Sequence, residues 1–342
     1  MELNVNETTS PANLIRQMLG AYENAQLIYV AAKLGIADFL SDGPRYSDDL
    51  ANIAGLNADA LRRVMRGLVN RGILTEVSSG NFGLTPSGEC LKKNELEDWN
   101  GIAINVGELL YSTWGSLLYS VQTGKPAFEH VHGMKWFEYL EKHPEQGQIF
   151  NNGMANDTQN VAIAVCQNYD FSKVRTIADI GGGQGILLSQ VLNLDPQMQG
   201  LLFDAASVLA NAPARLEKAG VSERCEMVAG NFFESVPSGC DAYMLKSIIH
   251  DWNDEESIQI LKNVRASMEP DARLLMIEPI LPERVEDFSV AVEMDLGMLL
   301  LLNGRERTVS EYRSLYEAVG LELIQVIDTG TPFCIIEGKP IN

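Results

Sequence analysis

Apolar residues in the first hundred positions recur at helical spacing before giving way to two short strands. Residues 14–31 carry apolar side chains that predict a first amphipathic helix or pair of helices. Ser47 is placed to cap a helix that ends at Ala54, and Asn57 to cap a longer helix that ends at Asn70. The chain is therefore expected to begin with a helical segment.

The longer of these helices places apolar side chains on one face and leads into a predicted hairpin. Strands are expected at 72–77 and 82–85, separated by a Ser-Ser-Gly-Asn turn at 78–81. The order helix, helix, hairpin is the layout of a winged helix, which we assign to a first domain over residues 1–98. The apolar face consists of Leu61, Val64, Met65, Leu68 and Val69.

Residues 99–168 continue the helical pattern and are rich in aromatic side chains. From residue 174 onward, strands alternate with helices, which implies a parallel sheet covered on both faces. The sequence thus predicts an α/β domain over 99–342, with ligands beyond the carboxyl ends of its strands. Strands are expected at 175–180, 200–204, 225–229, 240–246, 272–278, 322–328 and 333–338, and helices at 185–193, 207–219, 254–268, 286–301 and, from a capping box of Thr308 and Glu311, 308–319.

The acidic composition narrows the choice of partners. The chain has 342 residues and a net charge of −20, from 46 acidic and 26 basic residues. Such a charge repels polyanions at long range, so nucleic acid and anionic membranes are poor partners. Most of the charge is expected to form a solvated surface.

Cysteine usage and the N-terminus favour a cytoplasmic protein. The five cysteines lie far apart and include no Cys-x-x-Cys pair, which argues against a disulfide framework or a zinc site. The first ten residues lack the basic and apolar regions of a signal peptide. No apolar stretch is long enough to span a bilayer.

The glycine-rich segment 177–185, Ile-Ala-Asp-Ile-Gly-Gly-Gly-Gln-Gly, is the sharpest chemical signal. It joins a predicted strand to a predicted helix, and its glycines permit positive φ and close approach of a ligand. The spacing of Gly181, Gly183 and Gly185 departs from the dinucleotide fingerprint, which opposes a nicotinamide oxidoreductase. Asp179 disfavours a phosphate but can hold a methionyl ammonium, directly or through water. The turn therefore suits S-adenosylmethionine.

Residues at the ends of the next two strands support a nucleoside. Asp204 follows Asp179 by 25 residues, and a carboxylate at that point can accept both ribose hydroxyls. After the third strand, Asn231 is placed to hydrogen-bond the adenine edge and Phe232 to pack on its face.

A series of short motifs in a fixed order extends over nearly the whole chain. They are LGIADFL, FEYLEKHPEQGQIFNNGM, DIGGGQG, GNFF, LKSIIHDW, EPILP and GRERT. In this order the sequence resembles the small-molecule O-methyltransferases that include plant caffeic acid and flavonoid enzymes, hydroxyindole O-methyltransferase and bacterial antibiotic-tailoring enzymes. The resemblance implies a Rossmann-like, seven-stranded methyltransferase domain with an N-terminal domain that mediates homodimerisation and helps close the partner's acceptor pocket.

The resemblance also assigns cofactor contacts. It implies that Gly181, Asp204 and Lys246 contact S-adenosylmethionine, which leaves as S-adenosylhomocysteine. Asn231 stands where the family usually has aspartate. Asparagine still accepts a hydrogen bond through its carbonyl but has no charge. The family is metal-independent, and the four histidines of this sequence form no ligand cluster.

His250, just beyond the fourth predicted strand, is the general base that the resemblance implies. A phenol must lose its proton as it attacks the methyl carbon, and histidine is suited to accept that proton near pH 7. The glutamates that flank the base in the family match Glu278 and Glu306. Asp251 is placed either to assist His250 or to cap the next helix.

The expected acceptor pocket combines the helical segment 99–168 with loops of the α/β domain. Met154 matches a family methionine that packs on the acceptor ring, whereas Asp157 stands where some plant enzymes carry histidine, so phenylpropanoid specificity is not implied. The expected pocket residues are Asn151, Met154, Asp157, Trp252, Met298 and Asn303. The acceptor is expected to be a small hydroxylated aromatic secondary metabolite.

Two alternatives follow from other features. Arginines at 62, 63, 66 and 71 give the winged helix some likeness to a DNA-binding regulator, but residues 1–98 carry 9 basic and 13 acidic residues, a net charge of −4. Relatives of the family also methylate nitrogen or carbon. The combination of His250 with Glu278 and Glu306 favours an acidic hydroxyl.

Overall fold

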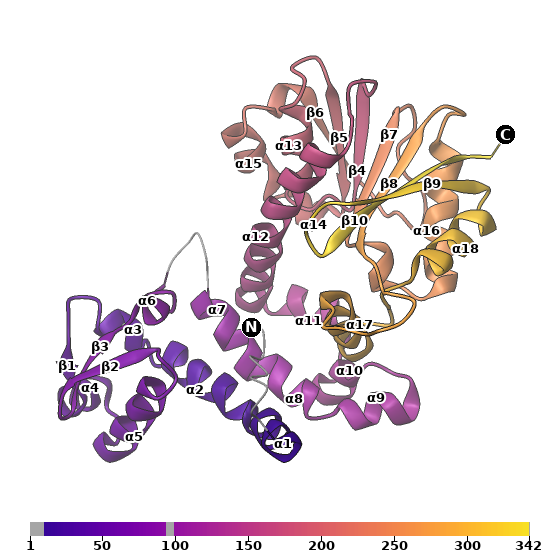
Figure 1. The fold of residues 1–342 in the computed structure, drawn as a ribbon. Helices are drawn as coiled ribbons and strands as arrows, with labels where there is room; N and C mark the ends of the chain where they lie inside the picture. The colour runs from indigo at the N-terminus through magenta and orange to yellow at the C-terminus, as the bar shows by residue number, and fades with distance from the viewer. Residues whose placement is uncertain (1–9, 94–98, 342) are drawn as a thin grey trace. The chain divides into compact units, whose positions relative to one another are not determined.

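The helices and strands of this chain cluster into two units in the computed structural model (Figure 1). Unit 1 comprises residues 1–115 and 140–153, and unit 2 comprises residues 116–139 and 154–342. The structure describes residues 10–93 and 99–341, without the side chains of 155–157. Within these ranges, no helix combines the length and apolar composition needed to cross a bilayer.

Unit 1 is mostly helical and holds a small antiparallel sheet in the order β1-β3-β2. The strands are β1 (Arg45–Tyr46), β2 (Leu74–Ser78) and β3 (Asn81–Leu84). The helices are α1 (Pro11–Gly20), α2 (Tyr22–Lys33), α3 (Ile36–Phe39), α4 (Ser47–Ala54), α5 (Ala58–Val69), α6 (Pro86–Glu89), α7 (Trp99–Asn105), the π-helix η1 (Val106–Leu110) and α8 (Tyr111–Trp114).

The predicted helix, helix, hairpin order of unit 1 is confirmed, with two local differences. The side chain of Asn57 accepts from the amide of Ala60 at 2.9 Å and caps α5 as predicted. The prediction that Ser47 caps α4 is wrong, because Ser47 is the first helical residue and is buried. The pairing of β1 with β3 was not predicted, because two residues are too few to show an alternation.

Apolar residues from several elements form the core of unit 1. Met65, Leu68 and Phe82 are fully buried, so the predicted inner face of α5 packs against β3. Helix α1 buries none of its residues. It is amphipathic, as predicted, but its apolar face does not enter this core.

Unit 2 is built on a seven-stranded sheet in the order β6-β5-β4-β7-β8-β10-β9. All neighbours are parallel except β10, which runs antiparallel to β8 and β9. This arrangement confirms the predicted α/β class and all seven predicted strands. The strands are β4 (Thr176–Ile180), β5 (Gln199–Asp204), β6 (Cys225–Ala229), β7 (Ala242–Lys246), β8 (Arg273–Pro279), β9 (Leu321–Asp328) and β10 (Phe333–Pro340).

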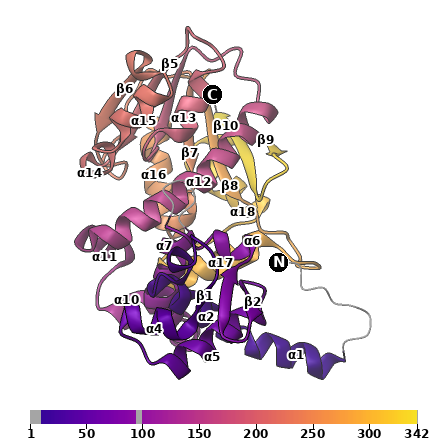
Figure 2. The same cartoon turned by 90° about the vertical axis from the view of Figure 1, so that its left-hand side faces the viewer.

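Helices cover both faces of this sheet (Figures 1 and 2). The core on one face joins the sheet to α12, α13 and α15, and the core on the other face joins it to α16 and α18. The helices are α9 (Leu117–Thr123), α10 (Ala127–His132), α11 (Trp136–Lys142), α12 (Pro144–Asn168), α13 (Ile186–Leu192), α14 (Ala206–Leu209), α15 (Ala212–Lys218), α16 (Asp254–Ser267), α17 (Val290–Leu301) and α18 (Val309–Ala318), with 3₁₀ turns η2 (Ser222–Arg224) and η3 (Ile249–Asp251). Helices α11 and α12 extend from one unit into the other.

The helix predictions for unit 2 hold with two corrections. The predicted helix at 207–219 is broken into α14 and α15, because Pro213 lacks an amide proton and favours a new helix start. Helix α17 begins at Val290 rather than at residue 286, and Phe288 before it is 79% exposed and lacks packing that would hold it in a helix. The predicted capping box of Thr308 and Glu311 is present.

Candidate active site

The glycine segment forms a tight turn between β4 and α13. Gly181, Gly183 and Gly185 have φ values of 69°, 59° and 77°, a region that side chains disfavour. A Cβ atom at Gly181 would lie 2.4 Å from Cδ1 of Ile248, which follows β7. The turn therefore lies directly against the loop that carries His250.

Asp204 ends β5 and closes the turn. Its Oδ2 accepts from the amide of Gly183 at 2.8 Å, and its Oδ1 accepts from the amide of Ala205 at 2.7 Å. Burial raises the pKa of this carboxyl, and the two amides oppose that shift. Each carboxylate oxygen can accept more than one hydrogen bond, so Asp204 can still receive two hydroxyls from a ligand.

Asp179 lies beneath the same turn and is 1% exposed. A Cβ atom at Gly182 would come within 2.6 Å of its Cγ. Burial, with the negative charge of Asp204, raises the pKa of Asp179 to about 7, although the amide of Leu188 lowers it. Its Oδ2 has no hydrogen-bond partner among the described residues. A cationic ligand beside Asp179 would stabilise its charged form and so offset both the cost of burial and the repulsion from Asp204.

The other predicted cofactor residues lie around the turn. Phe232 is 3.7 Å from the position of a Cβ at Gly181, and its ring centroid lies 6.1 Å from that of Trp252. Lys246 ends β7, and its Nζ lies 5.2 Å from the ring centroid of Phe333. The exposed Asn231 uses its side chain locally, accepting from the amide of Phe233 and donating to Glu234.

His250 lies in the 3₁₀ turn η3 after β7, with only 5% of its surface exposed. Its Nδ1 is 2.7 Å from Oε1 of Glu306 and 3.7 Å from Oε2 of Glu278. Both glutamates are fully buried. The structure thus brings together three residues that the sequence places in three separate motifs.

Glu278 also fixes the backbone that leads to the histidine. Its Oε1 accepts from the amides of Ile248 and Ile249 at 3.0 and 2.9 Å. Ser247 has a φ of 54°, a left-handed conformation that costs energy for a residue with a side chain. The two amides that follow this strained residue are therefore turned toward a buried carboxylate.

The charges around His250 favour its protonated form. Burial acts to lower the pKa of His250, but Glu278, Asp251 and Glu306 outweigh it and raise this pKa to about 10. Oδ1 of Asp251 lies 3.4 Å from Nε2 of the imidazole. Burial raises the pKa of Asp251 to about 6, against the lowering effect of His250. Burial also raises the pKa values of both glutamates.

When the imidazole is deprotonated, this arrangement can accept a proton and stabilise the charge that results. Glu306 orients Nδ1, so the imidazole has its other nitrogen, Nε2, available to receive a proton from a ligand. An imidazole beside carboxylates is a stronger base than free histidine, which brings its proton affinity close to that of a phenol.

The same three side chains have the composition of a metal site. One ligand atom each from His250, Glu278 and Glu306 lies within 4.8 Å of the others. A nitrogen and two carboxylate oxygens are ligands that several divalent metals accept. The family resemblance predicts metal independence, and the scattered histidines agree with it. A site of one histidine with two glutamates needs no histidine cluster, so metal independence stays a prediction.

The expected pocket residues are divided between the two units. Trp252 and Met298 lie half-buried in unit 2, and Asn303 follows α17 and is exposed. Nε1 of Trp252 is buried and has no hydrogen-bond partner in the described part of the chain. Met154, on α12, also belongs to unit 2, whereas Asn151 belongs to unit 1. The side chain of Asp157 lies outside the described residues.

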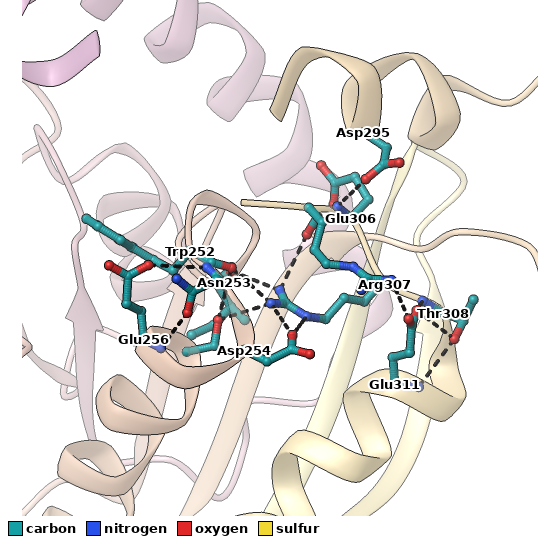
Figure 3. A network of polar contacts seen from close by, with 12 residues as sticks. Trp252, Asn253, Asp254, Glu256, Asp295, Glu306, Arg307, Thr308 and Glu311 are labelled. Carbon is teal, nitrogen blue, oxygen red and sulfur yellow. Dashed lines mark hydrogen bonds and ion pairs between the residues drawn. The ribbon is translucent and has the colours of Figure 1, made fainter. Parts of the chain in front are cut away.

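Residues that support the site were missed in the sequence. Asp295 accepts from the amide of Glu306 at 2.9 Å, and Arg307 is buried beside it (Figure 3). The Arg-Glu-Arg run looks like a solvated charged loop in the sequence. Only the place of GRERT among the ordered motifs that carry the family resemblance, rather than its composition, offered a signal that the segment is interior.

Comparisons with known families match both parts of the chain. Residues 17–94 match the O-methyltransferase dimerisation domain, and residues 114–322 match the O-methyltransferase domain.

Three of the four arginines near α5 contact side chains of unit 1, namely Ser79, Glu76 and Glu23. The likeness to a DNA-binding regulator is therefore not supported by this unit.

Individual relatives cover almost the full length. Phenazine O-methyltransferase PhzM of Lysobacter antibioticus is 42% identical over 96% of each chain. The 8-amino-8-demethylriboflavin N,N-dimethyltransferase of Streptomyces davaonensis is 33% identical over 92% of this chain and 91% of its own. The crystal structure of NcsB1, an O-methyltransferase from neocarzinostatin biosynthesis, contains S-adenosylmethionine and 2-hydroxy-5-methyl naphthoic acid. It has a TM-score of 0.82 at 28% identity and covers 93% of this chain and 96% of its own.

Proposed function

Because the chain belongs to the O-methyltransferase family, we propose that it transfers the methyl group of S-adenosylmethionine to a hydroxyl of a small aromatic metabolite, with His250 as the general base. The observation that carries this proposal is the 2.7 Å contact between Nδ1 of His250 and the buried Glu306, beside Glu278. This geometry suits a histidine that receives a proton and becomes charged.

The cofactor is proposed to lie on the glycine turn. The turn has no room for a Cβ at Gly181, and Asp179 offers a buried oxygen without a partner among the described residues. Asp204 would accept the ribose hydroxyls and Asp179 would attract the ammonium. Gly183, Lys246, Phe232 and Asn231 complete the proposed contacts. When bound, the cofactor supplies a methyl group already activated by its sulfonium.

The protein's own part is to orient the acceptor and to remove its proton. Nε2 of His250 takes the hydroxyl proton as the oxygen attacks, while Glu306 and Glu278 stabilise the imidazolium. Orientation of two bound reactants contributes on the order of 7–11 kcal/mol at best, so correct placement accounts for much of the expected acceleration. Asp251, 3.4 Å from Nε2, is placed to favour the same charged state.

The acceptor site is proposed to include Trp252 and Met298, with Met154, Asp157, Asn151 and Asn303 as further contacts. The indole nitrogen of Trp252, which has no partner among the described residues, is a donor that a polar acceptor group would satisfy. Methionine side chains adapt readily to flat aromatic ligands.

Methylation of nitrogen is a second candidate function, since a 33% identical relative is an N,N-dimethyltransferase. A neutral aromatic amine is a nucleophile before it loses a proton, so it needs a base less than a phenol does. A buried histidine with two glutamates is therefore better explained by a hydroxyl acceptor.

The N-terminal unit is proposed to form a homodimer. Its match to a dimerisation domain agrees with the apolar residues that α1 leaves at least half exposed, among them Ile15, Met18 and Leu19. Sedimentation of the chain as a monomer at micromolar concentration would contradict this arrangement.

The direct test is incubation with methyl-labelled S-adenosylmethionine and paired aromatics that carry either a hydroxyl or an amine at the same position. We expect label on the hydroxylated member of a pair, identified by mass spectrometry and NMR. Labelling of amines alone would support the second candidate, and labelling of neither by a folded, cofactor-binding enzyme would contradict both.

A further inference from the structure

Arg307 is a buried cation that the proposed mechanism does not use. It is only 1% exposed, although arginine is rarely buried unless its charge is matched. Nε and Nη2 of its guanidinium donate to Oδ1 of Asp254 at 3.0 and 2.7 Å. Asp254 is the first residue of α16 and is 59% exposed. One carboxylate balances the charge of Arg307 but occupies only part of a group with five donors.

Besides weaker contacts with Oγ of Ser257 and the carbonyl of Arg305, the guanidinium donates to the backbone around His250. Nη1 of Arg307 donates to the carbonyl of Ile249 at 3.0 Å, and Nη2 donates to the carbonyl of Trp252 at 2.9 Å. Figure 3 shows the guanidinium between Trp252 and Asp254. The two carbonyls belong to the residue before His250 and to the second residue after it. One side chain therefore brackets the turn that carries the imidazole.

The backbone of the arginine's own segment contacts the same turn. The amide of Arg305 donates to the carbonyl of His250 at 2.8 Å. A Cβ atom at Gly304 would lie 1.9 Å from that carbonyl oxygen, so no other residue fits there without displacement. The amide of Glu306 is held by Asp295 of α17. The Glu306 segment is thus fixed from both sides.

The chemical type of residue 307 matters because its side chain joins the segment of Glu306 to the turn of His250. An apolar residue of similar size would avoid the cost of burying a charge. A lysine would keep the charge, but its donors radiate from one atom and cannot span carbonyls on both sides of a turn. A planar fork with its acceptors on Ile249, Trp252 and Asp254 fixes the distance between two segments that lie more than fifty residues apart in sequence.

We infer that Arg307 is a positioning residue, which holds the segment of Glu306 against the turn of His250 and so sets the contact between their side chains. Arg307 reaches the site only through the backbone and touches no reacting group. The inference rests on the proposed function, because the contact between Glu306 and His250 affects turnover only if His250 is the general base. A shift of about 1 Å between catalytic groups can lower turnover about 100-fold.

The experiment compares Arg307→Lys and Arg307→Met with a matched control, Arg305→Met. Arg305 is two residues away, and its side chain is half-exposed and pairs with Glu311 at the surface. Each protein is labelled with ¹⁵N-histidine and saturated with S-adenosylhomocysteine. The chain has four histidines, so His250→Ala assigns the resonance of His250. The pKa of His250 and its Nδ1 proton resonance are then measured directly, without any acceptor.

We expect the control to match the wild type. In Arg307→Lys, the downfield Nδ1 proton should weaken or disappear, and the pKa of His250 should fall by about one unit, a tenfold change in its protonation equilibrium. With the acceptor identified in the labelling experiment, kcat should fall while the KM for S-adenosylmethionine stays constant. A change in global stability alone would not move the resonance of one histidine in the folded protein.

Arg307→Met is the larger perturbation. If Arg307→Met does not fold, Asp254→Ala takes its place, because Asp254→Ala loosens the guanidinium of Arg307 without removing it. A wild-type pKa and Nδ1 resonance for His250 in the folded variants would overturn the inference. That result is separate from failure of the proposed function, which would appear as wild-type turnover in His250→Ala whatever the state of residue 307.

Discussion

The cofactor turn and the catalytic centre of this chain are assembled in opposite ways. Most of the turn comes from one continuous segment, 179–185, closed by Asp204 at the end of the adjacent strand. The centre instead combines His250 of the turn η3, Glu278 of strand β8 and Glu306 of the loop before α18. A turn of this kind depends on local backbone conformation, whereas the centre depends on how segments far apart in the chain pack.

This difference appears in the kinds of contact that hold each region. The turn is fixed by glycines with positive φ and by backbone amides that donate to Asp204. The centre buries two carboxylates, those of Glu278 and Glu306, beside the imidazole of His250, so each charge depends on the others. Removing one member from such a buried group leaves its partner uncompensated. Substitutions should therefore affect binding in the turn and proton transfer in the centre.

The substitution His250→Ala should produce the largest effect and separate the two regions most clearly. Loss of a general base lowers turnover by about 10²–10⁴-fold, while affinity for S-adenosylhomocysteine should stay unchanged by calorimetry. Since a phenol ionises by itself at high pH, the residual rate should rise toward pH 10. The exposed His130 provides a matched His→Ala control. Wild-type turnover in His250→Ala would remove the base from the mechanism.

Much of the α/β unit and of the turn was predictable because their signals are local. Apolar runs between turn residues located all seven strands, and the strand, glycine turn and helix order located the ligand-binding end. Asn57 and Thr308 mark the starts of α5 and α18, because the capping residue and the amide it binds lie within four residues of sequence. The two-residue strand β1 carries no such pattern and was visible only through its pairing with β3.

The centre was predictable only through the ordered motifs of a family. Nothing in the spacing of His250, Glu278 and Glu306 shows that three chain segments meet, because long-range packing decides it. The support by Arg307 and Asp295 was missed for the same reason. A charged run such as Arg-Glu-Arg usually lies on the surface, and here two of its three side chains are buried.

Replacement of Glu306 by Gln should shift the pH dependence of the centre. Glu306, with Glu278 and Asp251, raises the pKa of His250 against the lowering effect of burial. Removing one negative charge lowers that pKa. Because the deprotonated imidazole is the active form, the rising limb of kcat/KM should move to lower pH. The plateau should fall about tenfold or more, since Gln stabilises the imidazolium less than a carboxylate does.

The exposed Glu255 on α16 provides the control for charge alone. Glu255→Gln removes the same charge from a nearby surface and should leave the profile of kcat/KM against pH unchanged. A Glu306→Gln profile that keeps the wild-type limb would mean that Glu306 does not set the proton affinity of His250.

In the turn, Asp204→Ala should weaken cofactor binding and leave the centre intact. The substitution removes the proposed ribose acceptor and the partner of the Gly183 amide. Loss of hydrogen bonds to a charged group costs about 1.5–3 kcal/mol, equivalent to a tenfold or greater rise in the Kd for S-adenosylhomocysteine. The exposed Asp271 offers an Asp→Ala control. Equal affinity in wild type and Asp204→Ala would show that the ribose lies elsewhere, whereas an altered ¹⁵N resonance of His250 would show that the two regions are coupled.

Treatment that removes metal ions should have the smallest effect on turnover, although His250, Glu278 and Glu306 together provide the ligand types of a cation site. A metal needs the lone pair of Nδ1, which faces Glu306 at 2.7 Å, and the carboxylates that raise the pKa of His250 favour a proton there. Proton and metal thus compete for one site. Dialysis against a chelator should leave turnover and Tm unchanged, and added Zn²⁺ should inhibit more strongly as pH rises and the imidazole loses its proton. Loss of turnover on chelation, restored by one equivalent of a divalent metal in the wild type but not in Glu278→Gln, would instead identify the centre as a metal site.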